Sequence, residues 1–107
     1  KGSHFSSFYL ELLQIVKQVR PDFDVAILVT KEFKWSELKS MEEIDAVHAN
    51  KKYYKSSYLN LASEAKKPMR FYGINGNEPF LRNPHPIVVG WITDYPKKVA
   101  TFINGKV

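Results

Sequence analysis

One uninterrupted apolar segment, residues 24–30 (DVAILVT), constrains the fold more than any other part of the chain. It is rich in β-branched side chains, and no polar residue stands between its first and last positions. Such a run is typical of a β-strand that is covered on both faces, because a strand with one solvated face alternates apolar and polar residues. We therefore expect a central strand here.

Three helices are predicted beside this strand. An apolar stripe at three- and four-residue spacing marks the first, and Pro21 ends it. A capping-box pattern that begins at Ser40 marks the second, which is short. The third is rich in lysine and ends before Pro68. The predicted spans are roughly residues 6–19, 41–48 and 51–67.

The remaining strand candidates all lie in the second half of the chain. They are residues 69–74, a weak segment at 80–82, and residues 87–93 and 98–103. Tyr95-Pro96-Lys97 is expected to turn the last two into a hairpin. Because the strands cluster late in the sequence, we predict an α+β fold in which the helices pack on one face of an antiparallel or mixed sheet of four to five strands.

The length of 107 residues predicts a single domain over residues 5–107. Residues 1–4 (KGSH) are expected to be the remnant of an expression tag. The absence of cysteine excludes disulfides and thiolate metal sites, and no apolar run is long enough to cross a bilayer. We expect an intracellular protein, cytoplasmic or nuclear, with no membrane partner, no cofactor and no metal.

The charge distribution gives the main indication of a partner. The chain carries a net charge of +5, and residues 51–70 hold six basic side chains, one acid and three tyrosines. Lysines attract phosphate, and an aromatic ring can stack on a base. These residue types together favour a small, non-enzymatic binding domain with nucleic acid as its ligand.

A helix over residues 51–67 would place its lysines along one flank. In that phase Tyr53 would be exposed, whereas Tyr54 and Tyr58 would pack in the core. Alternation in the last strands would add a mixed basic and aromatic row to the uncovered sheet face. The candidate binding residues are Lys51, Lys52, Tyr53, Lys55, Lys66, Lys67, Arg70, Tyr72 and Lys98.

Several alternatives stay open. The lysine flank is also compatible with a solvated surface, or with a protein-interaction module, such as an inhibitor or adaptor from a mobile element, that binds an acidic partner. A metal-independent ribonuclease would use His85 or His48. Asp22 and Glu32 with Lys34 match a nuclease pattern, but the uninterrupted strand between them would hold the two carboxylates apart. We therefore predict no catalytic residue.

Overall fold

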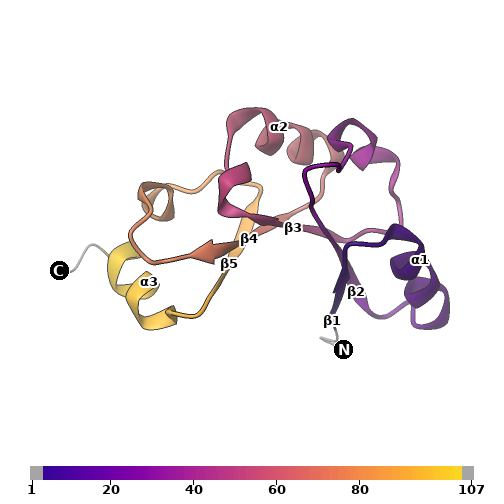
Figure 1. The fold of residues 1–107 in the computed structure, drawn as a ribbon, viewed down its shortest axis with the longest axis horizontal. Coiled ribbons are helices and arrows are strands. Elements are labelled where there is room, and N and C mark those ends of the chain that lie inside the picture. Colours follow the sequence, from indigo (N-terminus) through magenta and orange to yellow (C-terminus); the bar gives the residue numbers. More distant parts are fainter. Residues whose placement is uncertain (1–3, 105–107) are drawn as a thin grey trace.

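The computed structural model describes residues 4–104, and these form a five-stranded sheet with helices (Figure 1). Every pair of neighbouring strands is parallel, and the strands follow one another in the sheet in their chain order. The predicted α+β fold with an antiparallel or mixed sheet is therefore wrong, and the protein is α/β. The strands are β1 (His4–Ser7), β2 (Asp24–Leu28), β3 (Ala46–Asn50), β4 (Met69–Ile74) and β5 (Val88–Thr93).

The connections between the strands carry the helical segments. A parallel neighbour can be reached only by crossing over the sheet, and crossovers of one hand all fall on the same face. The α-helices are α1 (Leu10–Val19), α2 (Ser56–Ala65) and α3 (Pro96–Ile103). Short 3-10 helices lie between β2 and β3 (η1, Trp35–Ser40), before α2 in the connection from β3 to β4 (η2, Lys51–Tyr53) and between β4 and β5 (η3, Pro79–Arg82), whereas α3 follows β5.

One hydrophobic core lies between the sheet and this helical layer. The sheet contributes alternate residues, such as Val47 and Ala49 on β3 and Met69 and Phe71 on β4. Each of the six helical segments contributes at least one buried side chain to the same cluster. Within residues 4–104 the second face of the sheet is consequently left without a helical layer.

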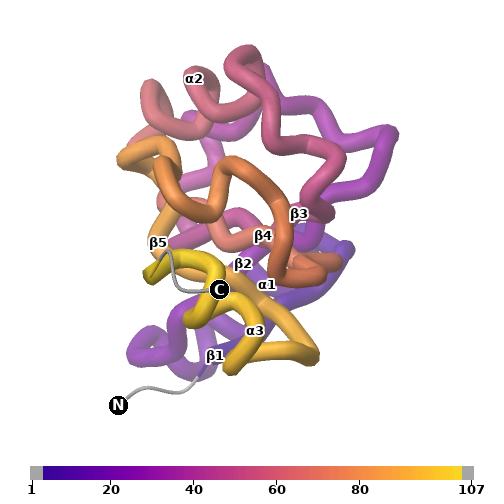
Figure 2. Tube along the Cα trace, turned by 90° about the vertical axis from the view of Figure 1, so that its left-hand side faces the viewer, coloured from indigo at the N-terminus to yellow at the C-terminus, as the bar shows by residue number. Residues whose placement is uncertain are grey.

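The molecule is elongated, and β4 points along its long axis toward α3 (Figure 1). Its principal extents are 46 × 30 × 21 Å, and the long axis runs from α1 to α3 (Figure 1). The radius of gyration is 14.4 Å, compared with about 13 Å for a compact domain of this length. Figure 2 looks along the sheet from the α3 end, with α1 at the far end.

Two segments predicted to be helical form strands in part, because they pair with neighbouring strands of the sheet. Residues 46–50 were assigned partly to a short helix, but they form β3 between two neighbouring strands. Ser40 caps no helix, because its hydroxyl donates to the carbonyl of Glu37 at 2.8 Å and ends η1 instead. The first helix is confirmed in its second part only, since α1 begins at Leu10.

The C-terminal half contains two more corrections. Residues 98–103 were expected to be a strand in a hairpin, but they belong to α3, which Pro96 begins from a position where proline needs no hydrogen-bond donor. The weak strand at 80–82 is the 3-10 helix η3. The strands predicted at 69–74 and 87–93 are confirmed within one residue.

The N-terminus adds a strand that the sequence did not predict. His4, assigned to the tag remnant, begins β1 and pairs with Asp24 on β2. The other residues of that remnant, 1–3, lie outside the described part of the chain. No helix within residues 4–104 is long and apolar enough to span a bilayer.

Candidate ligand site on the open face of the sheet

The pleat of the sheet determines which side chains line the uncovered face. In a strand, neighbouring residues point to opposite sides, so the residues between the core positions share the other side. We call this side the open face. Its residues include Ser6, Ala26, Ala46, His48, Asn50, Arg70, Tyr72 and Gly90, as the strand register shows.

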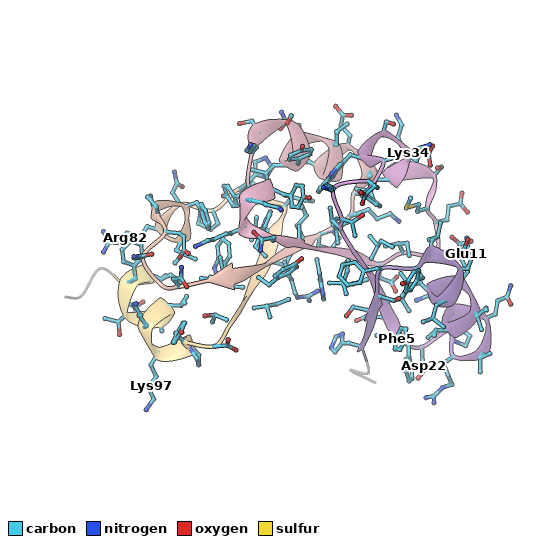
Figure 3. All side chains as sticks on the ribbon, viewed as in Figure 1. Phe5, Glu11, Asp22, Lys34, Arg82 and Lys97 are labelled. Carbon is cyan, nitrogen blue, oxygen red and sulfur yellow. The ribbon has the colours of Figure 1, made fainter. Side chains whose placement is uncertain are left out.

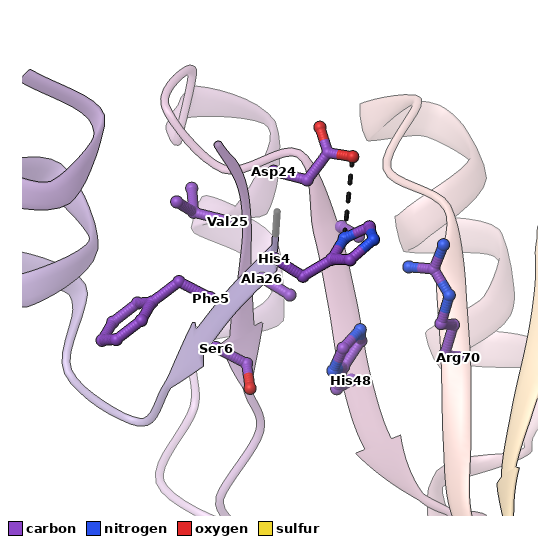
Figure 4. Close-up of a pocket in the computed structure, with 9 residues that line it drawn as sticks. His4, Phe5, Ser6, Asp24, Val25, Ala26, His48 and Arg70 are labelled. Atoms are coloured by element: carbon purple, nitrogen blue, oxygen red, sulfur yellow. Dashed lines mark ion pairs between the residues drawn. The ribbon is translucent and has the colours of Figure 1, made fainter. Parts of the chain in front are cut away.

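A hollow of about 80 Å³ lies on this face between β1 and β4. The small side chains of Ala26 and Ala46 line its apolar part, and His4, His48 and Arg70 point into the same space (Figure 4). Phe5 and Val25 point away toward α1 in the same view. Asp24 pairs with His4 at 3.7 Å, but both side chains are more than half exposed, so this pair contributes little.

Two polar groups in the hollow have no partner among the described residues. Nε2 of His48 is shielded from solvent and makes no hydrogen bond. Arg70 is half-buried as a residue, and its guanidinium forms no ion pair and no hydrogen bond with residues 4–104. Buried or half-buried donors of this kind are normally satisfied, because an unpaired polar group is costly.

The electrostatics of the hollow favour an anion. Burial lowers the pKa of His48, and the positive charges of Arg70 and His4 lower it further. The imidazole is therefore neutral at neutral pH, while the guanidinium keeps its charge. Gly90 on β5 lies beneath the side chain of Arg70, whose carbon atoms would be 3.6 Å from an added Cβ at that position. Arg70 thus extends along the surface of the sheet.

A second hollow, of about 330 Å³, lies where β4 and β5 end. Ligands of open parallel sheets bind beyond the carboxyl ends of the strands at a point where the strand order reverses, whereas this sheet keeps its chain order from β1 to β5. Tyr72 lines this hollow and also belongs to the open face, two residues after Arg70. Tyr72 does not line the first hollow, so the two hollows share no lining residue. The rest of the lining comes from the last residues of β4 and β5 and from the residues that follow them: Gly73, Ile74, Asn75, Ile92, Thr93, Asp94 and Tyr95.

Glu78 fixes the loop at that edge. Its carboxylate accepts hydrogen bonds from Lys51 Nζ at 2.6 Å and from the backbone N–H groups of Asn75 at 2.9 Å and Gly76 at 3.0 Å. Burial alone would raise the pKa of Glu78, but these three donors outweigh it and lower the pKa to about 2. Gly76 has a φ of +107°, and a Cβ there would lie 2.7 Å from Lys98 Cγ, so the turn requires glycine.

The predicted lysine flank does not exist as one helical surface. Asn50 accepts a hydrogen bond from the N–H of Lys52 and begins the 3-10 helix η2, and α2 starts only at Ser56. Lys66 ends α2 in the left-handed conformation, with a φ of 58°. These two breaks change the helical phase, and Tyr53, predicted to be exposed, is only 9% exposed.

The predicted site residues are therefore scattered. Lys51 is paired with Glu78, and Lys67 donates to the carbonyl of Ile44 at 2.7 Å. Lys98 lies on α3, not on a strand. Lys52, Lys55 and Lys66 are exposed around η2 and α2. Of the nine residues, the structure brings Arg70 and Tyr72 together on the open face.

Sequence reasoning missed Glu78 and did not place His48 beside Arg70. The alternation in residues 46–50 (AVHAN) was the available signal, because it puts His48 and Asn50 on one side of a strand. No sequence signal marked Glu78, since a single acid after a turn is usually solvated.

The residues considered for catalysis lie elsewhere. His85 is held within its own loop, where Nδ1 accepts a hydrogen bond from the N–H of Ile87 at 3.1 Å. Asp22 precedes β2 and Glu32 follows it, so the uninterrupted strand separates the two carboxylates of the nuclease pattern. The sequence matches no protein-family model and no curated protein, so its own chemistry has to indicate the ligand.

Proposed function

We propose that the open face binds a phosphate-bearing ligand, with single-stranded nucleic acid as the source of the phosphate. The observation that carries this proposal is the unpaired guanidinium of Arg70 beside the unpartnered Nε2 of His48. A guanidinium presents a fork of N–H donors that matches two phosphate oxygens. The net charge of +5 adds a general attraction for polyanions.

One neighbour of Arg70 supplies a contact for a base. Tyr72 lies on the same strand and the same face, about 6 to 7 Å further along. Asn50 is its register partner on β3, but its amide turns toward the start of η2, where Oδ1 accepts a hydrogen bond from the N–H of Lys52 and Nδ2 would lie 3.2 Å from a Cβ at Gly73. Aromatic rings on a sheet stack on unpaired bases. The ring of Tyr72 on the open face therefore favours a single strand over a duplex.

We infer binding without turnover. General acid–base chemistry needs a base that is oriented by a second group and lies within hydrogen-bond reach of its target. Nε2 of His48 has no hydrogen-bond partner among the described residues, so no second group is seen that orients it as a base. Arg70 remains charged and can hold an anion but cannot accept a proton.

Replacing Arg70 is expected to weaken oligonucleotide binding strongly. Arg70→Gln removes a charge-assisted contact, which corresponds to about a 10- to 100-fold loss of affinity. Lys52→Gln is the matched control, because Lys52 is exposed and lies away from the open face. Fluorescence anisotropy with single-stranded DNA and RNA at low salt measures both. Equal losses, or no binding by the wild-type protein, would contradict the proposal.

A competition experiment with three unlabelled competitors identifies which kind of molecule supplies the phosphate. If nucleic acid is the ligand, inorganic phosphate and a mononucleotide should compete much more weakly than an unlabelled oligonucleotide. Affinity should also fall with salt, with a log–log slope of about −0.7 for each neutralised phosphate. Competition by the mononucleotide at the same concentration as the oligonucleotide would assign the site to a small phosphate ester instead.

The pH dependence of His48 gives an independent prediction. In the free protein its pKa should lie below the ordinary value of 6.5, because burial and two cations disfavour the imidazolium. A bound phosphate should raise this pKa, and by linkage affinity should increase as the pH falls through the pKa of the complex toward the lower pKa of the free protein. An NMR titration of the imidazole protons with and without ligand measures both values. If the ligand leaves the pKa of His48 unchanged, His48 is not part of the phosphate site.

A further inference from the structure

The turn that follows β4 contains Asn75-Gly76, and an asparagine before a glycine is the pair of residues most prone to spontaneous deamidation. In this reaction the backbone nitrogen of the glycine gives up its proton and attacks the side-chain carbonyl carbon of the asparagine. The new C–N bond closes a succinimide ring, and the side-chain nitrogen leaves with that proton as ammonia. Water then opens the ring at either carbonyl and gives aspartate or isoaspartate.

The fold keeps both reacting residues in place. Gly76 cannot be exchanged for a bulkier residue, because its φ of +107° and its contact with Lys98 both require glycine. Glycine has no side chain that would hinder the attack of its own nitrogen. Asn75 is exposed, so its side chain is free to turn toward that nitrogen. Only a contact that restrains the backbone of the turn can therefore slow the reaction.

Glu78 supplies such a contact. The N–H of Gly76 donates to Oε1 of Glu78 at 3.0 Å, and the N–H of Asn75 donates to Oε2 at 2.9 Å. Gly76 is buried, so water does not replace this acceptor. Because one carboxylate holds both N–H groups, the backbone between them cannot rotate without breaking a charge-assisted hydrogen bond.

The charge of Glu78 opposes the reaction as well. Burial would raise the pKa of Glu78, but Lys51 and the backbone donors lower it to about 2, so the carboxylate is ionised at neutral pH. Loss of the Gly76 proton would leave an anionic nitrogen 3.0 Å from an anionic oxygen, and like charges repel strongly where water is excluded. A carboxylate with so low a pKa is also too weak a base to remove an amide proton. Glu78 therefore stabilises the protonated, unreactive form of the nitrogen.

We propose that Asn75-Gly76 is a latent deamidation site, with water as the co-reactant, which the carboxylate of Glu78 keeps unreactive in the folded protein. Deamidation would change the second hollow, because Asn75 and Asp94 both line it and an aspartate at position 75 would add another acid. Isoaspartate would also insert a further carbon atom into the main chain. That insertion changes the spacing of the two N–H groups that Glu78 holds.

Peptide mapping by mass spectrometry in a mildly alkaline buffer tests the proposal. In the native wild-type protein Asn75 should deamidate much more slowly than in the same protein denatured with urea. Glu78→Gln keeps the length of the side chain and removes its charge, so deamidation of Asn75 should become about 10-fold faster or more, as expected when a hydrogen bond loses its charged partner. Equal rates in native and denatured wild-type protein, or in wild type and Glu78→Gln, would overturn the proposal.

Leu13→Ala separates this local contact from unfolding of the whole domain. Leu13 is fully buried on α1, so its truncation destabilises the fold. It lies at the end of the molecule opposite α3, as the labelled side chains of Glu11 on α1 and Lys97 on α3 show (Figure 3), and the Glu78 contacts remain in place.

If Glu78 controls the reaction, deamidation of Asn75 should stay much slower in Leu13→Ala than in Glu78→Gln. If Leu13→Ala accelerates the reaction as much as Glu78→Gln does, global unfolding controls it and the proposal is wrong. Neither substituted position belongs to the open-face phosphate site, so this result is independent of the oligonucleotide assay.

Discussion

Tyr53→Ala is expected to lower the free energy of unfolding by about 3 to 5 kcal/mol, as truncation of a buried aromatic residue does. Tyr53 is 9% exposed and packs against two other aromatic rings. Its ring centroid lies 6.1 Å from that of Trp35 and 5.5 Å from that of Tyr58. This cluster closes the core between η1, η2 and α2, so the loss of the central ring leaves a cavity that these short segments cannot fill.

Urea denaturation followed by circular dichroism measures this loss. Tyr9→Ala is the matched control, because Tyr9 is 68% exposed and its removal should change stability by about 0.5 kcal/mol or less. If the two substitutions had the same small effect, Tyr53 would lie on a surface and the continuous helix first predicted over residues 51–67 would be restored.

The second large effect is expected for Glu78→Ala, with a loss of about 2 to 4 kcal/mol. The substitution leaves two backbone N–H groups and the ammonium of Lys51 without their shared acceptor. The expected loss is smaller than for a fully buried ion pair, because the Lys51 side chain is partly exposed and water can solvate its ammonium group in the variant. Glu64→Ala on the exposed side of α2 is the control and should have little effect.

The free energy of unfolding should also depend on pH through the carboxylate of Glu78. The pKa of Glu78 is lowered from 4.5 to about 2 in the folded protein, so the folded state binds this proton less readily than the unfolded state. The stabilisation is therefore complete above pH 4.5 and is lost as the pH falls toward 2. In Glu78→Ala that part of the acid dependence should disappear. An unchanged acid profile would show that other carboxylates cause it.

The local parts of the fold were predictable from the sequence, but the direction of the strands was not. Residues 24–28 and 69–74 form strands because their apolar side chains fit a covered sheet whichever way the neighbours run. Direction depends on the connections instead. The segment between β2 and β3 is 17 residues long, residues 29–45, which is enough for a crossover to a parallel neighbour. Reading residues 41–48 as a helix hid this signal.

The same distinction applies to the candidate site. Arg70 and Tyr72 were predicted to share a sheet face, and they do, because alternation along a strand does not depend on the direction of its neighbours. The lysines of residues 51–67 were predicted to share one flank, and that prediction holds only if these residues form one continuous helix. Asn50 and Lys66 break that continuity through a side-chain cap and a left-handed residue, which a periodicity argument does not detect.

The most direct measurement is an NMR titration of backbone amides with a single-stranded oligonucleotide. If the open face is the binding surface, the largest shift changes should follow the outward-facing positions of β3 and β4, centred on His48, Arg70 and Tyr72, and extend to Gly90 on β5. In Arg70→Gln these changes should appear only at much higher oligonucleotide concentration. Changes confined to the exposed lysines around η2 and α2, or no changes at low salt, would contradict a phosphate site on the open face.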